Sequence, residues 1–198
     1  MRITITLIRH GETEANAAHR YLGQTEESLS ITGKKELAKR KEYFESPDLL
    51  LCSPMLRCRE SAEILFPDMT PVSVPEWKEI DFGIFEGKTY QELNGISIYQ
   101  AWIDSGGMLQ IPNGESRAQF CQRVLAGFAK CRKLFWEESR ISCVVHGGTI
   151  MALLSNWTGK DYYDFQVKNG EGFCCRLELT EENVEVLALK KLVVSTEL

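Results

Sequence analysis

The stretch ITITLI at residues 3–8 runs straight into RHGET at residues 9–13. A short run rich in β-branched residues that ends in polar residues is typical of a buried strand reaching the protein surface. In open α/β sheets, ligands bind beyond the carboxyl ends of the strands. This strand would bring to that edge Arg9, whose guanidinium binds anions, and His10, whose imidazole can act as nucleophile, base or acid. The pair favours phosphate chemistry at a histidine.

The rest of the chain alternates between strand-like and helix-like segments, which predicts an α/β fold. Besides the strand over 3–8, we expect strands over 48–52, 72–74 and 141–146, and helices from about residue 14 and over 32–44, 56–65, 116–136 and 149–157. The runs 173–179 and 184–193 resemble closing strands that form an antiparallel edge. The pattern predicts a three-layer α/β/α sandwich with a mostly parallel central sheet.

The segment at about 84–115 is rich in aromatics and helix formers but has no clear strand. We therefore expect a helical insertion that caps the active-site end of the sheet. The chain shows no repeat or long linker, so we predict one domain over residues 1–198.

Composition restricts the class of protein. The chain has 198 residues, 43% of them hydrophobic and 26% charged, which is typical of a globular protein. Its net charge of -5 argues against nucleic acid as the main partner. No run approaches the roughly 20 apolar residues of a membrane span, and the N-terminus lacks the layout of a signal peptide. We expect a cytoplasmic protein with no membrane partner.

The seven cysteines are odd in number and irregularly spaced, and no Cys-x-x-Cys pair occurs. This pattern predicts neither a disulfide framework nor a zinc site. We expect most of these thiols to act as small core hydrophobes in a reducing compartment.

Further polar residues follow other predicted strands. His146 ends the apolar run 141–145 and, like His10, precedes a glycine. Arg57 enters the first turn of a helix just after the run LLL at 49–51, and a helix N-terminus with an arginine is suited to phosphate. Glu79 lies near the start of the expected insertion and could protonate a leaving oxygen if burial raised its pKa. His19 lies in a polar stretch and is predicted to be a surface residue.

Two other phosphate-site motifs fail on spacing. GIFEGKT at 83–89 has three residues between its glycines where a P-loop needs four, and Lys35 replaces the Ser or Thr that the stretch 32–35 would need. A cysteine phosphatase loop starting at Cys52 would need an arginine at the position of Cys58. Cys52 is therefore predicted to be a core thiol.

Several motifs together resemble the histidine phosphatase superfamily, also called phosphoglycerate mutase-like. These are LIRHGET at 7–13 with Asn16, GQ at 23–24 followed by Leu29 and TG at 32–33, SPMLRCRESA at 53–62, EIDFGIFEG at 79–87, NGES at 113–116 and VHGG at 145–148. They cover most of the chain in the right order, although Ser61 stands where threonine is usual.

The resemblance implies a role for each matching residue. His10 would be the nucleophile that forms a phosphohistidine. Arg9, Arg57 and His146 would grip the phosphoryl oxygens, and Glu79 would protonate the leaving oxygen and then activate water. Asn16 would line the phosphate pocket, and the remaining substrate-binding positions would be Gly23, Gln24 and Gly147. No metal or other cofactor is implied.

The chemistry of these residues agrees with that division of roles. His10 must be neutral to attack phosphorus, and like-charge repulsion from Arg9 and Arg57 favours its neutral form. We expect His146 to serve as a cationic donor. Preorganised cations can replace the metal ion that other phosphoryl-transfer enzymes use.

The substrate remains open among several possibilities. The expected substrate is a small phosphate monoester, and the compact chain favours a phosphatase over the mutase branch. The segments 21–25, 77–83 and 99–103 are similar to α-ribazole phosphatases of cobalamin assembly. Tyr99 and Trp102 would either stack on a flat heterocycle or fill the core of the insertion.

Other functions stay in view: a broad-specificity small-molecule phosphatase, a phosphoglycerate mutase, or a non-catalytic binding module of the same fold. The presence of His10, Arg57, Glu79 and His146 disfavours the binding module. The sequence makes no prediction of oligomeric state.

Overall fold

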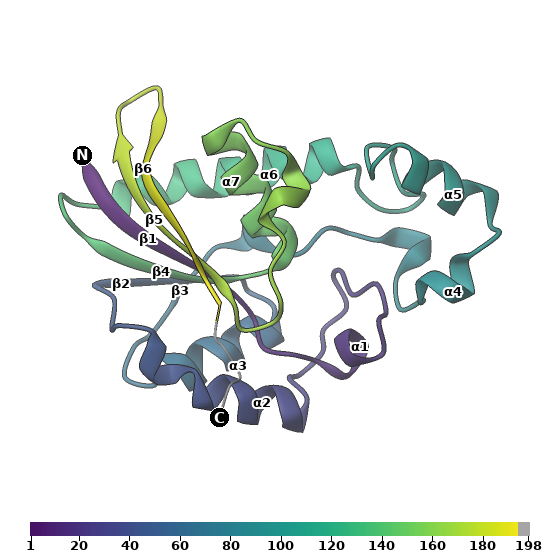
Figure 1. Ribbon diagram of the computed structural model, residues 1–198, viewed down its shortest axis with the longest axis horizontal. Helices are drawn as coiled ribbons and strands as arrows, with labels where there is room; N and C mark the ends of the chain where they lie inside the picture. The colour runs from purple at the N-terminus through teal and green to yellow at the C-terminus, as the bar shows by residue number, and fades with distance from the viewer. Residues whose placement is uncertain (194–198) are drawn as a thin grey trace.

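The computed structural model describes residues 1–193 and is built around one sheet (Figure 1). Its strands are β1 (Arg2–Arg9), β2 (Leu49–Cys52), β3 (Val72–Ser73), β4 (Arg140–Val145), β5 (Gly172–Leu179) and β6 (Val184–Leu192). They lie in the order β3-β2-β4-β1-β5-β6. β1 to β4 pair in parallel, whereas β5 and β6 pair antiparallel at one edge. The predicted mostly parallel sheet with an antiparallel edge is confirmed.

Helices cover both faces of the sheet, as the three-layer prediction requires (Figure 1). They are α1 (Glu14–Ala17), α2 (Ile31–Lys39), α3 (Leu56–Leu65), α4 (Tyr90–Leu93), α5 (Ser97–Asp104), α6 (Arg117–Cys131) and α7 (Gly147–Thr158). α2 and α3 pack on one face, and α6 and α7 pack on the other.

Alternation along β1 explains the two layers. Ile5 and Leu7 belong to the buried cluster beneath α6 and α7, whereas Ile8 belongs to the cluster beneath α2 and α3. Successive side chains of a strand point to opposite faces, so the consecutive residues Leu7 and Ile8 are buried in different layers.

Some predicted helices end earlier than expected. α2 stops at Lys39 and α6 at Cys131, and each is followed by a short 3₁₀ turn, at Lys41–Tyr43 and Arg132–Leu134. Tightening of the last turn into 3₁₀ geometry is common at helix ends. α1 is a single turn, and His19 follows it with a left-handed φ of 54° and an exposed side chain.

The segment between residues 83 and 115 extends beyond the carboxyl ends of the parallel strands (Figure 1). It holds α4 and α5 around a small buried cluster of Phe85, Leu93, Tyr99 and Ile111. Tyr99 is 7% exposed and fills this core, whereas Trp102 is half-buried at its margin. The core-filling alternative therefore holds for Tyr99, whereas Trp102 keeps part of its surface open.

None of the helices within residues 1–193 is both long and apolar enough to cross a membrane.

Candidate active site

Two neighbouring strands bring the two histidines together. β1 and β4 are paired with Arg9 opposite Val145, so His10 and His146 are the next residues on each strand. The backbone N–H of His10 donates to the Val145 carbonyl at 2.9 Å. The two imidazole rings lie edge to face with centroids 5.2 Å apart, and both are almost fully buried, His10 at 3% exposure.

Arg9 and Arg57 are held by backbone carbonyls at their terminal nitrogens. Arg57, at the N-terminus of α3, donates to the Thr25 carbonyl at 3.0 Å and the Gly23 carbonyl at 2.7 Å. Arg9 donates to the Val167 carbonyl at 2.8 Å. The Nε atoms of both arginines are buried and have no hydrogen-bond partner among the described residues. A buried cationic N–H without a partner is costly, so both groups are ready to bind the oxygens of an anion.

His10 is oriented by one hydrogen bond. Its Nδ1 lies 2.7 Å from the carbonyl oxygen of Gly11 and must donate to it, which leaves Nε2 with the lone pair in the neutral ring. Burial is the main reason that the pKa of His10 lies well below its ordinary value, with Arg57 and Arg9 lowering it further. Attack on phosphorus needs a neutral imidazole.

His146 lies in a similar environment. Its Nε2 lies 2.8 Å from the Ser53 hydroxyl, and burial, followed by Arg57 and His10, lowers its pKa well below the ordinary value. In the site without a ligand, burial beside cations thus acts against the cationic form that we expect of His146 as a donor. A bound phosphate dianion would supply an opposite charge and raise this pKa.

Glu79 lies beside the N-terminus of α7. Its carboxylate accepts hydrogen bonds from the backbone N–H groups of Ile80, at 2.9 Å, and Gly148, at 3.4 Å. Burial raises the pKa of Glu79, although the two backbone bonds, Arg57 and Arg9 act in the opposite direction. A carboxyl group with a raised pKa is suited to donating a proton.

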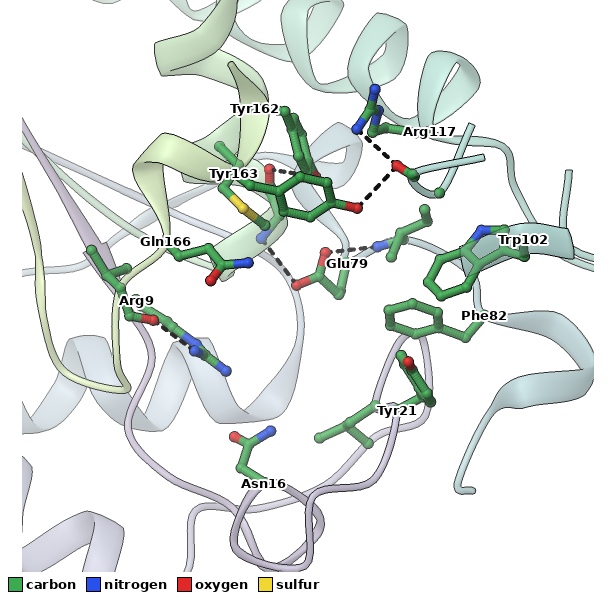
Figure 2. A pocket seen from close by; sticks show the side chains of 18 of the residues that line it. Arg9, Asn16, Tyr21, Glu79, Phe82, Trp102, Arg117, Tyr162, Tyr163 and Gln166 are labelled. Atoms are coloured by element: carbon green, nitrogen blue, oxygen red, sulfur yellow. Dashed lines mark hydrogen bonds between the residues drawn. The ribbon is translucent and has the colours of Figure 1, made fainter. Parts of the chain in front are cut away.

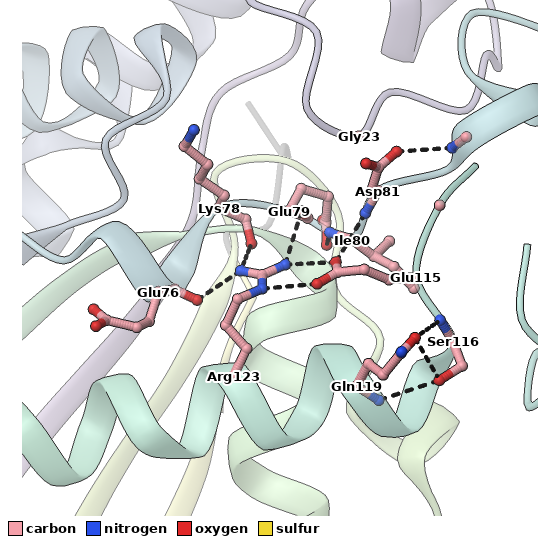
Figure 3. A network of polar contacts seen from close by, with 12 residues as sticks. Gly23, Glu76, Lys78, Glu79, Ile80, Asp81, Glu115, Ser116, Gln119 and Arg123 are labelled. Atoms are coloured by element: carbon pink, nitrogen blue, oxygen red, sulfur yellow. Dashed lines mark hydrogen bonds and ion pairs between the residues drawn. The ribbon is translucent and has the colours of Figure 1, made fainter.

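The backbone that carries Glu79 is clamped from α6 (Figure 3). Arg123 makes a bidentate ion pair with Glu115, at 2.9 and 2.6 Å. The same guanidinium donates to the carbonyls of Glu76, Lys78 and Glu79 at 2.7, 3.0 and 3.3 Å. Sequence reasoning missed Arg123. Its available signal was the position of this arginine eight residues after Glu115 of the NGES motif.

A cleft of about 720 Å³ opens beside these groups (Figure 2). Four of the predicted site residues line it, namely Arg9, Asn16, Glu79 and Gly147. His10, Arg57 and His146 are buried next to the lining residues and do not line the cleft themselves. Sequence reasoning missed Arg117, Met151, Tyr162, Tyr163 and Gln166, which come from α6, α7 and the segment after α7.

Asn16 is oriented by a second residue that sequence reasoning missed. Its Oδ1 accepts from the side-chain amide of Asn169 at 3.0 Å and from the backbone N–H of Thr13 at 3.4 Å. The side-chain NH₂ of Asn16 is therefore the group left to contact a ligand. Asn169 also donates to the carbonyl of His10 at 3.1 Å, so it links the two residues.

Neither Gly23 nor Gln24, both predicted to bind substrate, lines the main cleft. Gly23 accepts from Arg57 and donates to Glu86, and a Cβ at this position would lie 2.3 Å from the Ile80 carbonyl oxygen. Close packing therefore requires glycine there. Gln24 lines a separate small pocket and not the main cleft.

Comparison with known proteins decides the family. The model described as "Histidine phosphatase superfamily (branch 1)" matches residues 5–191. The chain belongs to this superfamily. The predicted family, fold class and enzyme class, a phosphoric monoester hydrolase, are confirmed.

Relatives of this histidine phosphatase carry different names. The chain is 31% identical to a probable phosphoglycerate mutase of Proteus mirabilis (strain HI4320), over 81% of this chain and 77% of that protein. It is 30% identical to the adenosylcobalamin/alpha-ribazole phosphatase of Escherichia coli (strain K12), over 83% and 85%. The crystal structure of the alpha-ribazole phosphatase of Shigella flexneri superposes with a TM-score of 0.80 at 26% identity and covers 100% of both chains.

Gly148 offers a test of how strictly Glu79 must be placed. A Cβ at Gly148 would lie 2.4 Å from Oε1 of Glu79, whereas one at Gly147 would lie 3.6 Å from Arg9, an ordinary contact. We expect Gly148→Ala to displace the carboxylate and lower kcat about a hundredfold, as a 1 Å misplacement can do. Gly147→Ala should cost much less. Steady-state kinetics of both variants check this, and equal losses would contradict it.

Proposed function

We propose that this histidine phosphatase hydrolyses small phosphate monoesters through a phosphohistidine at His10. The observation that carries the proposal is the pair of buried Nε–H groups of Arg9 and Arg57, which have no hydrogen-bond partner within residues 1–193, together with the His10 ring, whose pKa burial and these two arginines lower well below its ordinary value. These groups can bind phosphoryl oxygens and stabilise the charge that develops during transfer.

The proposed reaction has two steps. In the first, Nε2 of His10 attacks phosphorus, the bond to the ester oxygen breaks, and protonated Glu79 gives its proton to the leaving alcohol. In the second, the Glu79 carboxylate takes a proton from water, whose oxygen attacks phosphorus. The N–P bond then breaks, inorganic phosphate leaves, and the lone pair returns to His10. Glu79 thus acts first as acid and then as base.

We further propose α-ribazole 5′-phosphate as the substrate, which would place the protein in cobalamin assembly. The similarity of residues 21–25, 77–83 and 99–103 supports this choice, as do the names of the relatives from E. coli and S. flexneri. The aromatic lining of the cleft favours it over the phosphoglycerates, which have no flat ring to bury.

A phosphate-release panel tests this substrate. The purified protein should show a higher kcat/KM for α-ribazole 5′-phosphate than for p-nitrophenyl phosphate or simple sugar phosphates. Equal or lower values would remove the proposal and favour a broad-specificity phosphatase. Phosphoryl exchange between phosphoglycerates without release of phosphate would favour a mutase.

The proposal includes a cytoplasmic location. The seven thiols of the sequence favour it, since thiols persist in reducing compartments. Fractionation of cells that express the protein, followed by immunodetection, tests this part, and recovery outside the cytoplasmic fraction would contradict it.

A further inference from the structure

The residues that line the cleft lie in the same order as the parts of a phosphate ester, from the phosphoryl group to the alcohol (Figure 2). Arg9 lies on one side, Glu79 lies in the middle, and Phe82 and Trp102 lie on the opposite side. In a phosphomonoester the phosphoryl group, the bridging oxygen and the alcohol part also follow one another. With the phosphoryl group at Arg9 and the bridging oxygen at Glu79, the alcohol part points toward the aromatic side chains.

Three aromatic side chains on this side contact one another in tilted or edge-to-face geometry, and we call them the aromatic shelf: Tyr21, Phe82 and Trp102. Their ring centroids lie 5.0 Å apart for Tyr21 and Phe82, 5.9 Å for Tyr21 and Trp102, and 6.4 Å for Phe82 and Trp102. All three are half-buried and line the cleft. Aromatic side chains that remain open to a cleft can stack on a flat ligand.

The aromatic shelf packs against two more aromatic side chains of the same small core. Tyr99 stacks on Trp102 with a centroid distance of 6.1 Å, and its hydroxyl lies 2.7 Å from that of Tyr21. Phe85, fully buried, packs 5.7 Å from Trp102. The core of this segment is therefore filled by Tyr99 and Phe85, and the shelf residues remain available to a ligand.

The wall across from the shelf is also aromatic. Tyr162 and Tyr163 line it, and the guanidinium of Arg117 lies over their rings at 5.0 and 5.7 Å. Tyr163 and Arg117 both donate to the carbonyl of Gly106, at 3.1 and 3.0 Å, which joins this wall to the loop after α5. Aromatic rings therefore line the cleft on both sides of the position proposed for the alcohol part of the ester.

We propose that the aromatic shelf is a leaving-group subsite that stacks on a flat aromatic ring in the alcohol part of the ester. This inference rests on the proposed phosphatase function and adds the class of leaving group and the residues that select it. The volume of about 720 Å³ agrees, since pockets of this size hold ligands much larger than a three-carbon chain.

Three esters that share a ribose 5-phosphate unit provide the test: α-ribazole 5′-phosphate, adenosine 5′-phosphate and ribose 5-phosphate. The two ring-bearing esters should exceed ribose 5-phosphate in kcat/KM by about ten- to a hundredfold, the range expected from stacking one base on aromatic side chains. The difference should lie mostly in KM, because stacking on a remote ring binds the ground state and the transition state alike.

Variants of Trp102 separate stacking from mere packing. Trp102→Leu keeps apolar bulk without a flat ring and should reduce the ratio of kcat/KM between the ring-bearing esters and ribose 5-phosphate about tenfold, by the same stacking range. Trp102→Phe should keep most of the ratio. Tyr90→Ala is the matched control, because Tyr90 is 55% exposed in the same segment and does not line the cleft.

The outcomes distinguish the subsite from the proposed substrate. Equal kcat/KM for all three esters, or a ratio that Trp102→Leu leaves unchanged, overturns the subsite. Two equally good ring-bearing esters support the subsite and remove α-ribazole 5′-phosphate as the preferred substrate. If none is hydrolysed, the phosphatase proposal fails. In that case, calorimetry measures the dissociation constant of each of the three esters. Equal constants for the ring-bearing esters and ribose 5-phosphate overturn the subsite.

Discussion

Replacing His10 by alanine is expected to lower kcat at least about 10⁴-fold, in line with the loss of a nucleophile in other covalent enzymes. The variant keeps Arg9 and Arg57, so it should still bind the phosphate ester. Steady-state phosphate release measures the loss. Trapping with a labelled ester should give an acid-labile, alkali-stable adduct in the wild type and no adduct in His10→Ala.

The third histidine supplies the matched control. His19 is exposed and lies outside the cleft, so His19→Ala should keep both the rate and the labelled adduct. A labelled His10→Ala protein would place the nucleophile elsewhere. A wild-type protein that no ester labels would favour a non-catalytic binding module. Thermal unfolding of both variants distinguishes loss of chemistry from loss of fold.

Replacing Glu79 by glutamine is expected to lower kcat/KM for alkyl phosphates about 10²- to 10⁴-fold, the range of general acid catalysis. The loss should be much smaller for p-nitrophenyl phosphate, whose leaving group departs without a proton. Since Glu79 also activates water in the proposed second step, the phosphoenzyme should accumulate in this variant. Rapid-quench measurement should therefore show a burst of p-nitrophenol followed by slow turnover.

The pH dependence gives a second readout of Glu79. Because burial raises its pKa, the acid form persists to higher pH than in an ordinary glutamate. For an alkyl ester, kcat/KM should fall as pH rises through this pKa, and Glu79→Gln should lose that limb of the profile. Glu76→Gln is the control, because Glu76 pairs through its side chain with Lys130 and only its carbonyl contacts Arg123. An unchanged profile in Glu79→Gln would contradict the role as acid.

Much of the fold could be read from local pattern. The runs at 3–8 and 141–145 are the central strands β1 and β4, and each ends in two consecutive apolar residues that are buried on opposite faces of the sheet. Helix ends were less predictable: α2 and α6 tighten into 3₁₀ turns that no capping signal marks.

The sequence could likewise place some residues of the candidate site and not others. A residue that directly follows a parallel strand is carried to a known edge of the sheet, so His10 and His146 could be placed together from sequence alone. Arg57 could be placed in the same way from the apolar run before it, Glu79 was a candidate from its position near the insertion, and the family motifs added Asn16. Sequence could not indicate that Gln24 faces a separate pocket, because one residue along a loop changes the direction of a side chain.

The sequence by itself determined the order of strands and helices along the chain, the position of His10 and His146 at two strand ends and the family, because these depend on local periodicity and short motifs. Only the tertiary structure decided the cleft, the aromatic shelf, the contacts of Arg123 with the Glu79 backbone and the burial that lowers the pKa of His146. Tyr21, Phe82 and Trp102 lie far apart along the chain, and their contact exists only once α5 has packed beside the loop after α1. Protonation states follow the same rule, since burial and neighbouring charge are properties of the folded protein.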